Sequence, residues 1–147
     1  MVDIVHRVGI RTGSVADVYA ALTTVEGLSG WWAADTTGDP EVGGTLAFRF
    51  APGGIDMRVT DLVPGASVRW EVVGGPAEWI GTTVRWTLAR SGEYVVVLFA
   101  HEGWAEPVEF MYHCSTKWAT FLLSLKQLVE TGRGAPDPHD VAISDWH

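Results

Sequence analysis

Hydrophobic and polar residues alternate in five segments of the chain, and this two-residue period predicts β-strands with one buried face. The five segments are Val2–Ile10, Leu46–Phe50, Ile55–Val59, Val68–Val72 and Val84–Leu88. A sixth segment, Tyr94–Phe99, is apolar on both faces, which is typical of a central or covered strand. Turn sequences such as Pro52-Gly53-Gly54 and Ser91-Gly92 separate the later segments. Because consecutive strands with short turns pair antiparallel, we expect an antiparallel sheet of about six strands.

The apolar spacing changes to three and four residues in three other segments, which predicts helices. Two short helices follow the first strand: one begins after the capping residue Ser14, and the second contains Leu28, Trp31 and Trp32. The residues from Gly38 to Gly44 are predicted to form a loop. The longest helix is predicted from Pro107 to Thr131, before a stop at Gly132.

These elements predict one α+β domain that spans residues 1–147. A helix as long as the last one measures about 37 Å, enough to cross the concave side of a twisted sheet. We therefore expect a curved antiparallel sheet that encloses the long C-terminal helix around an apolar cavity. Residues 133–147 are mostly polar and include Pro136 and Pro138, so they are predicted to lie over the surface as a tail.

Charge and cysteine content narrow the expected partners and the compartment. The net charge of −8 and the presence of only two lysines argue against nucleic acid, which needs clustered basic residues. The chain has no apolar run of membrane-spanning length and no charged-then-apolar signal at its start. Cys114 is the single cysteine, which excludes an internal disulfide and suits a reducing compartment. We expect a soluble, cytoplasmic protein that does not insert into membranes.

The alternation also predicts where the charged residues of the sheet lie. If the apolar residues point inward, their neighbours point outward, unless a bulge reverses the order. Asp56 and Glu71 are then cross-strand partners on the outer face. The polar groups expected inside are His6, His101 and, close to a strand end, Asp61. The arginines expected on the outer face are Arg49, Arg58, Arg69 and Arg85.

The sequence contains no nucleophile elbow, phosphate-binding loop or dinucleotide-binding fingerprint. It also has no His-x-x-x-His or Cys-x-x-Cys spacing for a metal ion. His113 and Cys114 are adjacent, so about 100° separates them around a helix and they are poorly placed to share a metal. We therefore expect no catalytic residue, no metal site and no cofactor.

Eight tryptophans are many for this length, and tryptophan suits both cavity walls and filled cores because it combines a large apolar area with one N–H donor. His101 continues the inner face of the last strand and would reach the cavity. It could bond a ligand or transfer a proton, but we favour a structural role in which a backbone carbonyl or a tryptophan is its partner. The residues expected to line the cavity are Trp32, Phe48, Trp70, Trp86, Phe99, His101, Tyr112 and Trp118.

Several short sequences occur in an order that is typical of one family. They are Ile10–Leu22, Trp31-Trp32, Gly43-Gly44 with Phe48, His101-Glu102-Gly103-Trp104, and Leu125–Glu130 continuing into Thr131-Gly132-Arg133-Gly134-Ala135-Pro136. With them the chain resembles the homologues of the activator of the heat-shock chaperone ATPase, within the START-like (SRPBCC, helix-grip) superfamily. The family often has Gly-Trp where this chain has Lys117-Trp118, so Lys117 is expected to turn its ammonium group outward.

The resemblance implies the helix-grip fold and a cavity, but fold alone does not fix function. We expect noncatalytic binding of a small hydrophobic molecule between the sheet and the C-terminal helix. One alternative is a cyclase- or aromatase-like enzyme that uses the same cavity, with His101 as the proton-transfer group. The other is a chaperone-cofactor type of interaction protein that acts through its surface, although no sequence feature supports a chaperone partner.

Overall fold

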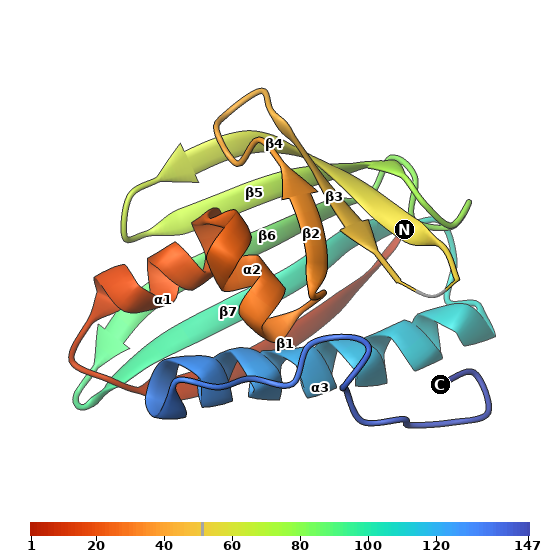
Figure 1. Ribbon diagram of the computed structural model, residues 1–147. Helices are drawn as coiled ribbons and strands as arrows, with labels where there is room; N and C mark the ends of the chain where they lie inside the picture. Colours follow the sequence, from red (N-terminus) through yellow and green to blue (C-terminus); the bar gives the residue numbers. More distant parts are fainter. Residues whose placement is uncertain (51) are drawn as a thin grey trace.

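A curved sheet of seven antiparallel strands arches over one long helix in the computed structural model, which describes residues 1–50 and 52–147 (Figure 1). The order of the strands across the sheet is β1-β7-β6-β5-β4-β3-β2. The helices are α1 (Val15–Thr23), α2 (Val25–Trp31) and α3 (Glu109–Thr131). The strands are β1 (Val2–Arg11), β2 (Asp35–Gly38), β3 (Thr45–Arg49), β4 (Gly54–Val63), β5 (Ser67–Gly74), β6 (Thr83–Ser91) and β7 (Tyr94–Trp104). The predicted α+β helix-grip architecture is confirmed, with one strand more than expected.

The additional strand, β2, has no hydrophobic pattern that could reveal it. Only one of its four side chains, that of Thr36, is buried. The strand forms because its backbone pairs with β3 at the edge of the sheet, from Asp35 opposite Arg49 to Gly38 opposite Leu46. Backbone pairing of this kind is independent of side-chain periodicity, so the sequence pattern could not predict it.

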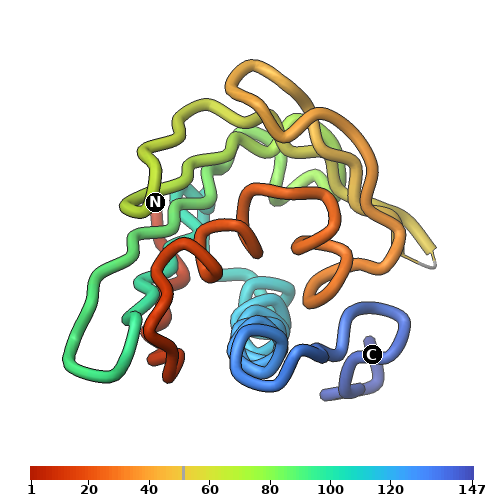
Figure 2. The backbone as a smooth tube through the Cα atoms, turned by 60° about the vertical axis from the view of Figure 1, so that its left-hand side comes forward, coloured from red at the N-terminus to blue at the C-terminus, as the bar shows by residue number. Residues whose placement is uncertain are grey.

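The predicted helices are present, and their ends have the expected chemistry. The N–H of Asp17 donates to the Ser14 hydroxyl at the start of α1 (3.0 Å). Helix α3 begins at Glu109, two residues later than predicted, and ends at Thr131. Gly132 follows in the left-handed region, with φ 87°, and its N–H donates to the Leu128 carbonyl (2.8 Å). Figure 2 looks nearly along α3 and shows the sheet curving around it.

One face of α3 packs into the concave side of the sheet. Trp118 and Phe121 are buried there, at 2% and 5% exposure. The Trp118 ring lies 4.5 Å from that of Phe99 and 4.9 Å from that of Trp32, measured between centroids. Aromatic pairs at such distances stabilise a core beyond the area they bury. The predicted contact between the helix and the sheet is therefore confirmed, and the space under the middle of α3 is filled.

The outer face of the sheet carries the expected row of exposed arginines, Arg49, Arg58, Arg69 and Arg85. Three of them form ion pairs: Arg49 with Asp56 (2.9 Å), Arg58 with Glu71 (2.7 Å) and Arg85 with Glu102 (3.0 Å).

Asp61 corrects one detail of the predicted alternation. It was expected inside, but it is exposed and lies opposite Arg69. The reason is an irregularity between Val59 and Asp61, where the pairing of β4 with β5 shifts by one residue. A bulge reverses the inward and outward alternation beyond it.

The C-terminal residues 133–147 double back along α3 (dark blue in Figure 1). Their backbone is tied to the end of α2: the N–H of Asp137 donates to the Trp32 carbonyl (2.8 Å), and the N–H of Ala34 donates to the Asp137 carbonyl (3.0 Å). The tail also brings one buried charged side chain, that of Asp140, to the helix. No helix among the described residues is long and apolar enough to cross a membrane.

Candidate functional site

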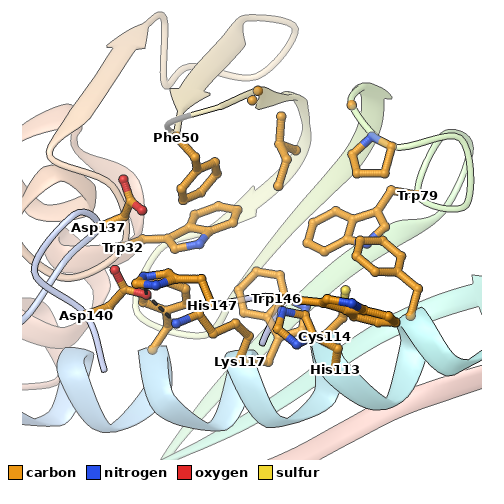
Figure 3. A pocket seen from close by; sticks show the side chains of 18 of the residues that line it. Trp32, Phe50, Trp79, His113, Cys114, Lys117, Asp137, Asp140, Trp146 and His147 are labelled. Atoms are coloured by element: carbon orange, nitrogen blue, oxygen red, sulfur yellow. Dashed lines mark hydrogen bonds and ion pairs between the residues drawn. The ribbon is translucent and has the colours of Figure 1, made fainter. Parts of the chain in front are cut away.

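A pocket of about 590 Å³ opens beside α3 (Figure 3). Its walls come from α3, from Phe50 and residues 52–55 of the β3–β4 hairpin, from the β5–β6 loop and from the C-terminal tail. The aromatic side chains of the wall are those of Trp32, Phe50, Trp79, Phe110, Trp118, Phe121 and Trp146. The pocket therefore lies toward one end of the enclosed space, next to the filled core.

Three nearly buried tryptophans from three different elements form the deep side of the pocket. Trp118 comes from α3, Trp32 from the residue that follows α2, and Trp79 from the loop between β5 and β6. The ring of Trp118 lies between the other two, 4.9 Å from Trp32 and 5.8 Å from Trp79. Because each ring is fixed by packing against another, this side of the pocket is rigid and apolar.

One end of the pocket, next to Trp32, is polar and is built around Asp140 (Figure 3). The Lys117 ammonium donates to Oδ2 of Asp140 and to the Val141 carbonyl (2.7 Å). The side chain of Asp140 is 1% exposed, and its Oδ1 atom has no hydrogen-bond partner among the described residues. Burial, followed by the charge of Asp140, raises the pKa of Asp137. This end of the pocket therefore holds two carboxyl groups and one ammonium group.

Lys117 corrects an expectation from the sequence. Its ammonium group was predicted to turn outward to water, but the side chain is only 15% exposed. The tail provides the reason, because it places a carboxylate and a carbonyl oxygen over the ammonium group. A lysine that is paired in this way can remain close to an apolar wall.

The two other polar groups in the α3 wall are Cys114 and His113. Burial raises the pKa of the Cys114 thiol to about 12, so the reactive thiolate is absent at neutral pH. His113 contacts the tail: its Nδ1 atom lies 3.2 Å from the Ser144 hydroxyl, and its ring lies 5.5 Å from that of Trp146. Burial, and then the charge of Lys117, lowers the pKa of His113, which favours the neutral ring.

His101 lies outside the pocket, in a closed network of hydrogen bonds. The Trp118 indole N–H donates to Nδ1 (3.2 Å), which leaves Nε2 to donate to the Thr82 hydroxyl (2.8 Å). The residue is fully buried, and burial lowers its pKa to about 3. His101 is therefore neutral at physiological pH and has both ring nitrogens occupied. These contacts agree with the structural role that we favoured from the sequence.

His6, the other inner histidine, also has a structural contact. Its Nε2 donates to the Ser115 carbonyl of α3 (3.0 Å), which joins β1 to the helix.

Of the eight side chains expected to line the cavity, Trp32 and Trp118 are in the pocket wall. Tyr112 is 68% exposed, because it lies about 160° around α3 from Cys114, and this corrects the expectation that it faces a cavity. The remaining candidates, besides His101, are buried in the filled core behind the pocket: Phe48, Trp70, Trp86 and Phe99. Alternation predicts that a side chain points inward, but it does not tell whether the space in front of it is empty.

Several pocket residues were missed in the sequence. Trp79 lies in a loop after Pro76 and belongs to no periodic segment. Phe110 is part of the apolar stripe of α3, and that stripe was a signal that could have identified it. The polar end depends on a contact between Lys117 and a residue 23 positions later, which no local pattern reveals.

Comparison with known proteins places the chain in a family. The model of the family described as "Activator of Hsp90 ATPase homolog 1-like protein" matches residues 12–130. The chain belongs to this family. The resemblance found in the sequence is thereby confirmed, and the fold is that of the START-like (SRPBCC) proteins.

Solved structures agree with this assignment. The Aha1 dimer from Colwellia psychrerythraea shares 45% sequence identity, with a TM-score of 0.84 over 91% of this chain and 100% of that chain. A protein from Staphylococcus saprophyticus is 16% identical, with a TM-score of 0.74 over 90% of this chain and 95% of that one. CalU16 from Micromonospora echinospora is 17% identical, with a TM-score of 0.73 over 88% and 77%. The last two likenesses show the fold alone. No curated protein matches the chain.

Proposed function

We propose that this family member binds a small hydrophobic molecule in the pocket beside α3 and does not transform it. The observation that supports the proposal is the size and lining of the pocket. Its volume of about 590 Å³ lies within the range of roughly 300–1,000 Å³ that is typical of small-molecule sites. Its deep side is formed by the rings of Trp32, Trp79 and Trp118, and one polar end offers a few groups that could orient a ligand.

Binding is favoured over catalysis by the state of four titratable groups in and next to the pocket. A catalytic nucleophile or base needs a pKa close to the working pH. The Cys114 thiol remains protonated, and His101 is neutral with both nitrogens occupied. Lys117 and Asp140 are bound to each other. These groups therefore suit the orientation of a ligand better than proton transfer.

A screen of hydrophobic metabolites by thermal shift tests the proposal. A ligand at a hundred times its dissociation constant adds about 2.7 kcal/mol to the free energy of unfolding, and the melting temperature rises accordingly. The variants Phe110→Ala and Tyr112→Ala form a matched pair, because both remove an aromatic side chain from the same turn of α3 but only Phe110 lines the pocket.

We expect Phe110→Ala to weaken binding of a confirmed ligand about tenfold, equivalent to 1.4 kcal/mol, and Tyr112→Ala to leave it unchanged. Equal effects of the two substitutions would show that the ligand binds elsewhere. Turnover of the ligand by the wild-type protein would favour the enzyme alternative.

A second candidate is the chaperone-cofactor type of interaction, which an exposed apolar area favours. Val5 on β1 and Leu98 on the adjacent strand β7 are 68% and 50% exposed and border a shallow hollow on the outer face of the sheet. The family description names an activator of a chaperone ATPase. If this surface binds an Hsp90-type chaperone, Leu98→Asp should abolish co-purification with it, whereas Val63→Asp, at an exposed position on β4, should not. Co-purification that survives Leu98→Asp would exclude this surface.

A further inference from the structure

The tail brings three potential metal ligands together at the polar end of the pocket. One donor atom from each of Asp137, Asp140 and His147 lies within 4.8 Å of the other two. Figure 3 shows the two carboxyl groups and the His147 ring at the same end of the pocket, beside Lys117. Asp137 is fixed by its backbone bonds to Trp32 and Ala34, and Asp140 by Lys117, so two of the three donors are on a supported part of the tail.

The surroundings of Asp140 favour a cation at this place. Its side chain is nearly inaccessible, its Oδ2 atom is bound by Lys117, and its Oδ1 atom has no partner among the described residues. A buried carboxylate oxygen without a hydrogen bond is costly, and such groups normally have a partner. Asp137 adds a second carboxyl group, while Lys117 supplies a single positive charge. The local charge is therefore not balanced by these three residues.

We propose that Asp137, Asp140 and His147 bind a divalent transition-metal ion, and that Zn²⁺ fits this set of ligands best. Imidazole nitrogen is a good ligand for zinc and related metals, whereas magnesium and calcium prefer sites made of oxygen alone. Lys117 holds one oxygen of Asp140 and leaves the other free, which is the usual way in which a second residue orients a metal-binding carboxylate. Three protein ligands leave a coordination position for water or for a group of a molecule in the pocket.

To bind an ion, the three donor atoms must come closer together than the 4.8 Å within which they lie. Donor atoms around a four-coordinate zinc are about 3.4 Å apart, given bonds of about 2.0–2.1 Å. The Nε2 atom of His147 lies 3.6 Å from Oδ2 of Asp140, the oxygen that Lys117 binds, so the imidazole ring is adjacent to the carboxyl group whose other oxygen, Oδ1, has no partner among the described residues. His147 is an exposed residue of the tail, so its ring can turn toward the carboxyl groups. The competing explanation is that a protonated His147 forms an ion pair with Asp140 and that no metal binds.

Calorimetric titration of the chain with ZnCl₂ separates these explanations. The protein is prepared without a histidine tag, treated with EDTA and dialysed, and MgCl₂ is titrated as the oxygen-preferring control. We expect one zinc ion per chain and an affinity at least a hundredfold lower for magnesium. Cobalt(II) provides a spectroscopic check, because a site of low coordination number gives a visible absorption band that added zinc removes.

Variants assign the site to the three residues. His147→Ala and Asp140→Asn should each weaken zinc binding at least tenfold. His147→Ala removes an exposed ring, so if Asp140→Asn does not fold, the result for His147→Ala decides the question. Asp145→Asn, an exposed carboxylate of the same tail outside the donor set, should bind within twofold of the wild type. The absence of saturable zinc binding, or unchanged binding in His147→Ala, would overturn the proposal. No hydrophobic ligand is present in these titrations, so their outcome is independent of the proposed binding function.

Discussion

Replacing Trp118 with alanine would remove the side chain that joins α3 both to the filled core and to the pocket. Trp118 is 2% exposed and packs against Phe99 and Trp32. Truncation of a buried tryptophan costs about 3–5 kcal/mol, since it loses the buried area and leaves a cavity. The change also removes the indole N–H that donates a hydrogen bond to His101 Nδ1. A buried acceptor left unpaired adds about 1–3 kcal/mol to the loss of stability. We expect a loss at the upper end of the first range, or above it.

Urea unfolding followed by far-UV circular dichroism measures this loss without relying on tryptophan fluorescence. With a denaturant slope of about 2 kcal/mol per molar, a loss of 3–5 kcal/mol lowers the midpoint by about 1.5–2.5 M. Trp118→Phe keeps an aromatic ring but no N–H, so it should lose about 1–3 kcal/mol, the cost of leaving His101 Nδ1 without its donor. Trp146→Ala is the matched control, because Trp146 is 49% exposed, and its loss should stay below about 1 kcal/mol. A loss below 1 kcal/mol for Trp118→Ala would refute the packing described above.

Two predictions concern His101. Burial lowers the pKa of His101 in the folded protein to about 3. Between pH 3 and about 6.5 the unfolded chain therefore binds a proton at His101 more readily than the folded protein does. As a result, the free energy of unfolding falls as the pH is lowered through that range. From pH 6.5 to 5.5 the wild type should lose about 1 kcal/mol more than His101→Gln in urea unfolding, and equal losses would contradict a buried neutral ring. His101→Gln should also leave the affinity for a pocket ligand within about tenfold, measured by fluorescence titration, because His101 is not part of the pocket wall. A larger fall in affinity would indicate that the ligand lies deeper than the pocket wall, next to the hydrogen bond between Trp118 and His101.

Local sequence patterns were sufficient for most of the fold. Strand alternation predicted the outward direction of Arg49, Arg58 and Arg85, and the three-four spacing predicted that Trp118 packs on the sheet. These patterns report which side of an element is buried, and the burial of apolar surface is the main driving force of folding. The same logic failed at Asp61, because a bulge changes the register without any requirement for a particular residue.

The candidate site could be predicted only in part, because it depends on contacts between distant segments. Trp32 and Trp118 were identified, but the filled core and the pocket are distinguished only by three-dimensional packing. Trp79 reaches the pocket from a loop with no periodicity, and Asp140 reaches it because Lys117 binds the tail. Ion pairs between residues far apart in the chain leave no trace in local spacing.

The C-terminal tail, residues 133–147, suggests one way in which ligand selectivity could differ among related proteins. The match to the family covers residues 12–130, whereas Asp137, Asp140, Trp146 and His147 lie beyond it and still form part of the pocket wall. The three tryptophans of the deep side thus lie within the matched region, and at the polar end Lys117 also lies within it, whereas both carboxyl groups come from the tail. Exchange of this segment between relatives would alter the chemistry of one end of the pocket while leaving the sheet and its helix unchanged. If the pocket binds a ligand as proposed above, the scaffold and the carboxyl groups that would face the ligand lie in separate stretches of the chain.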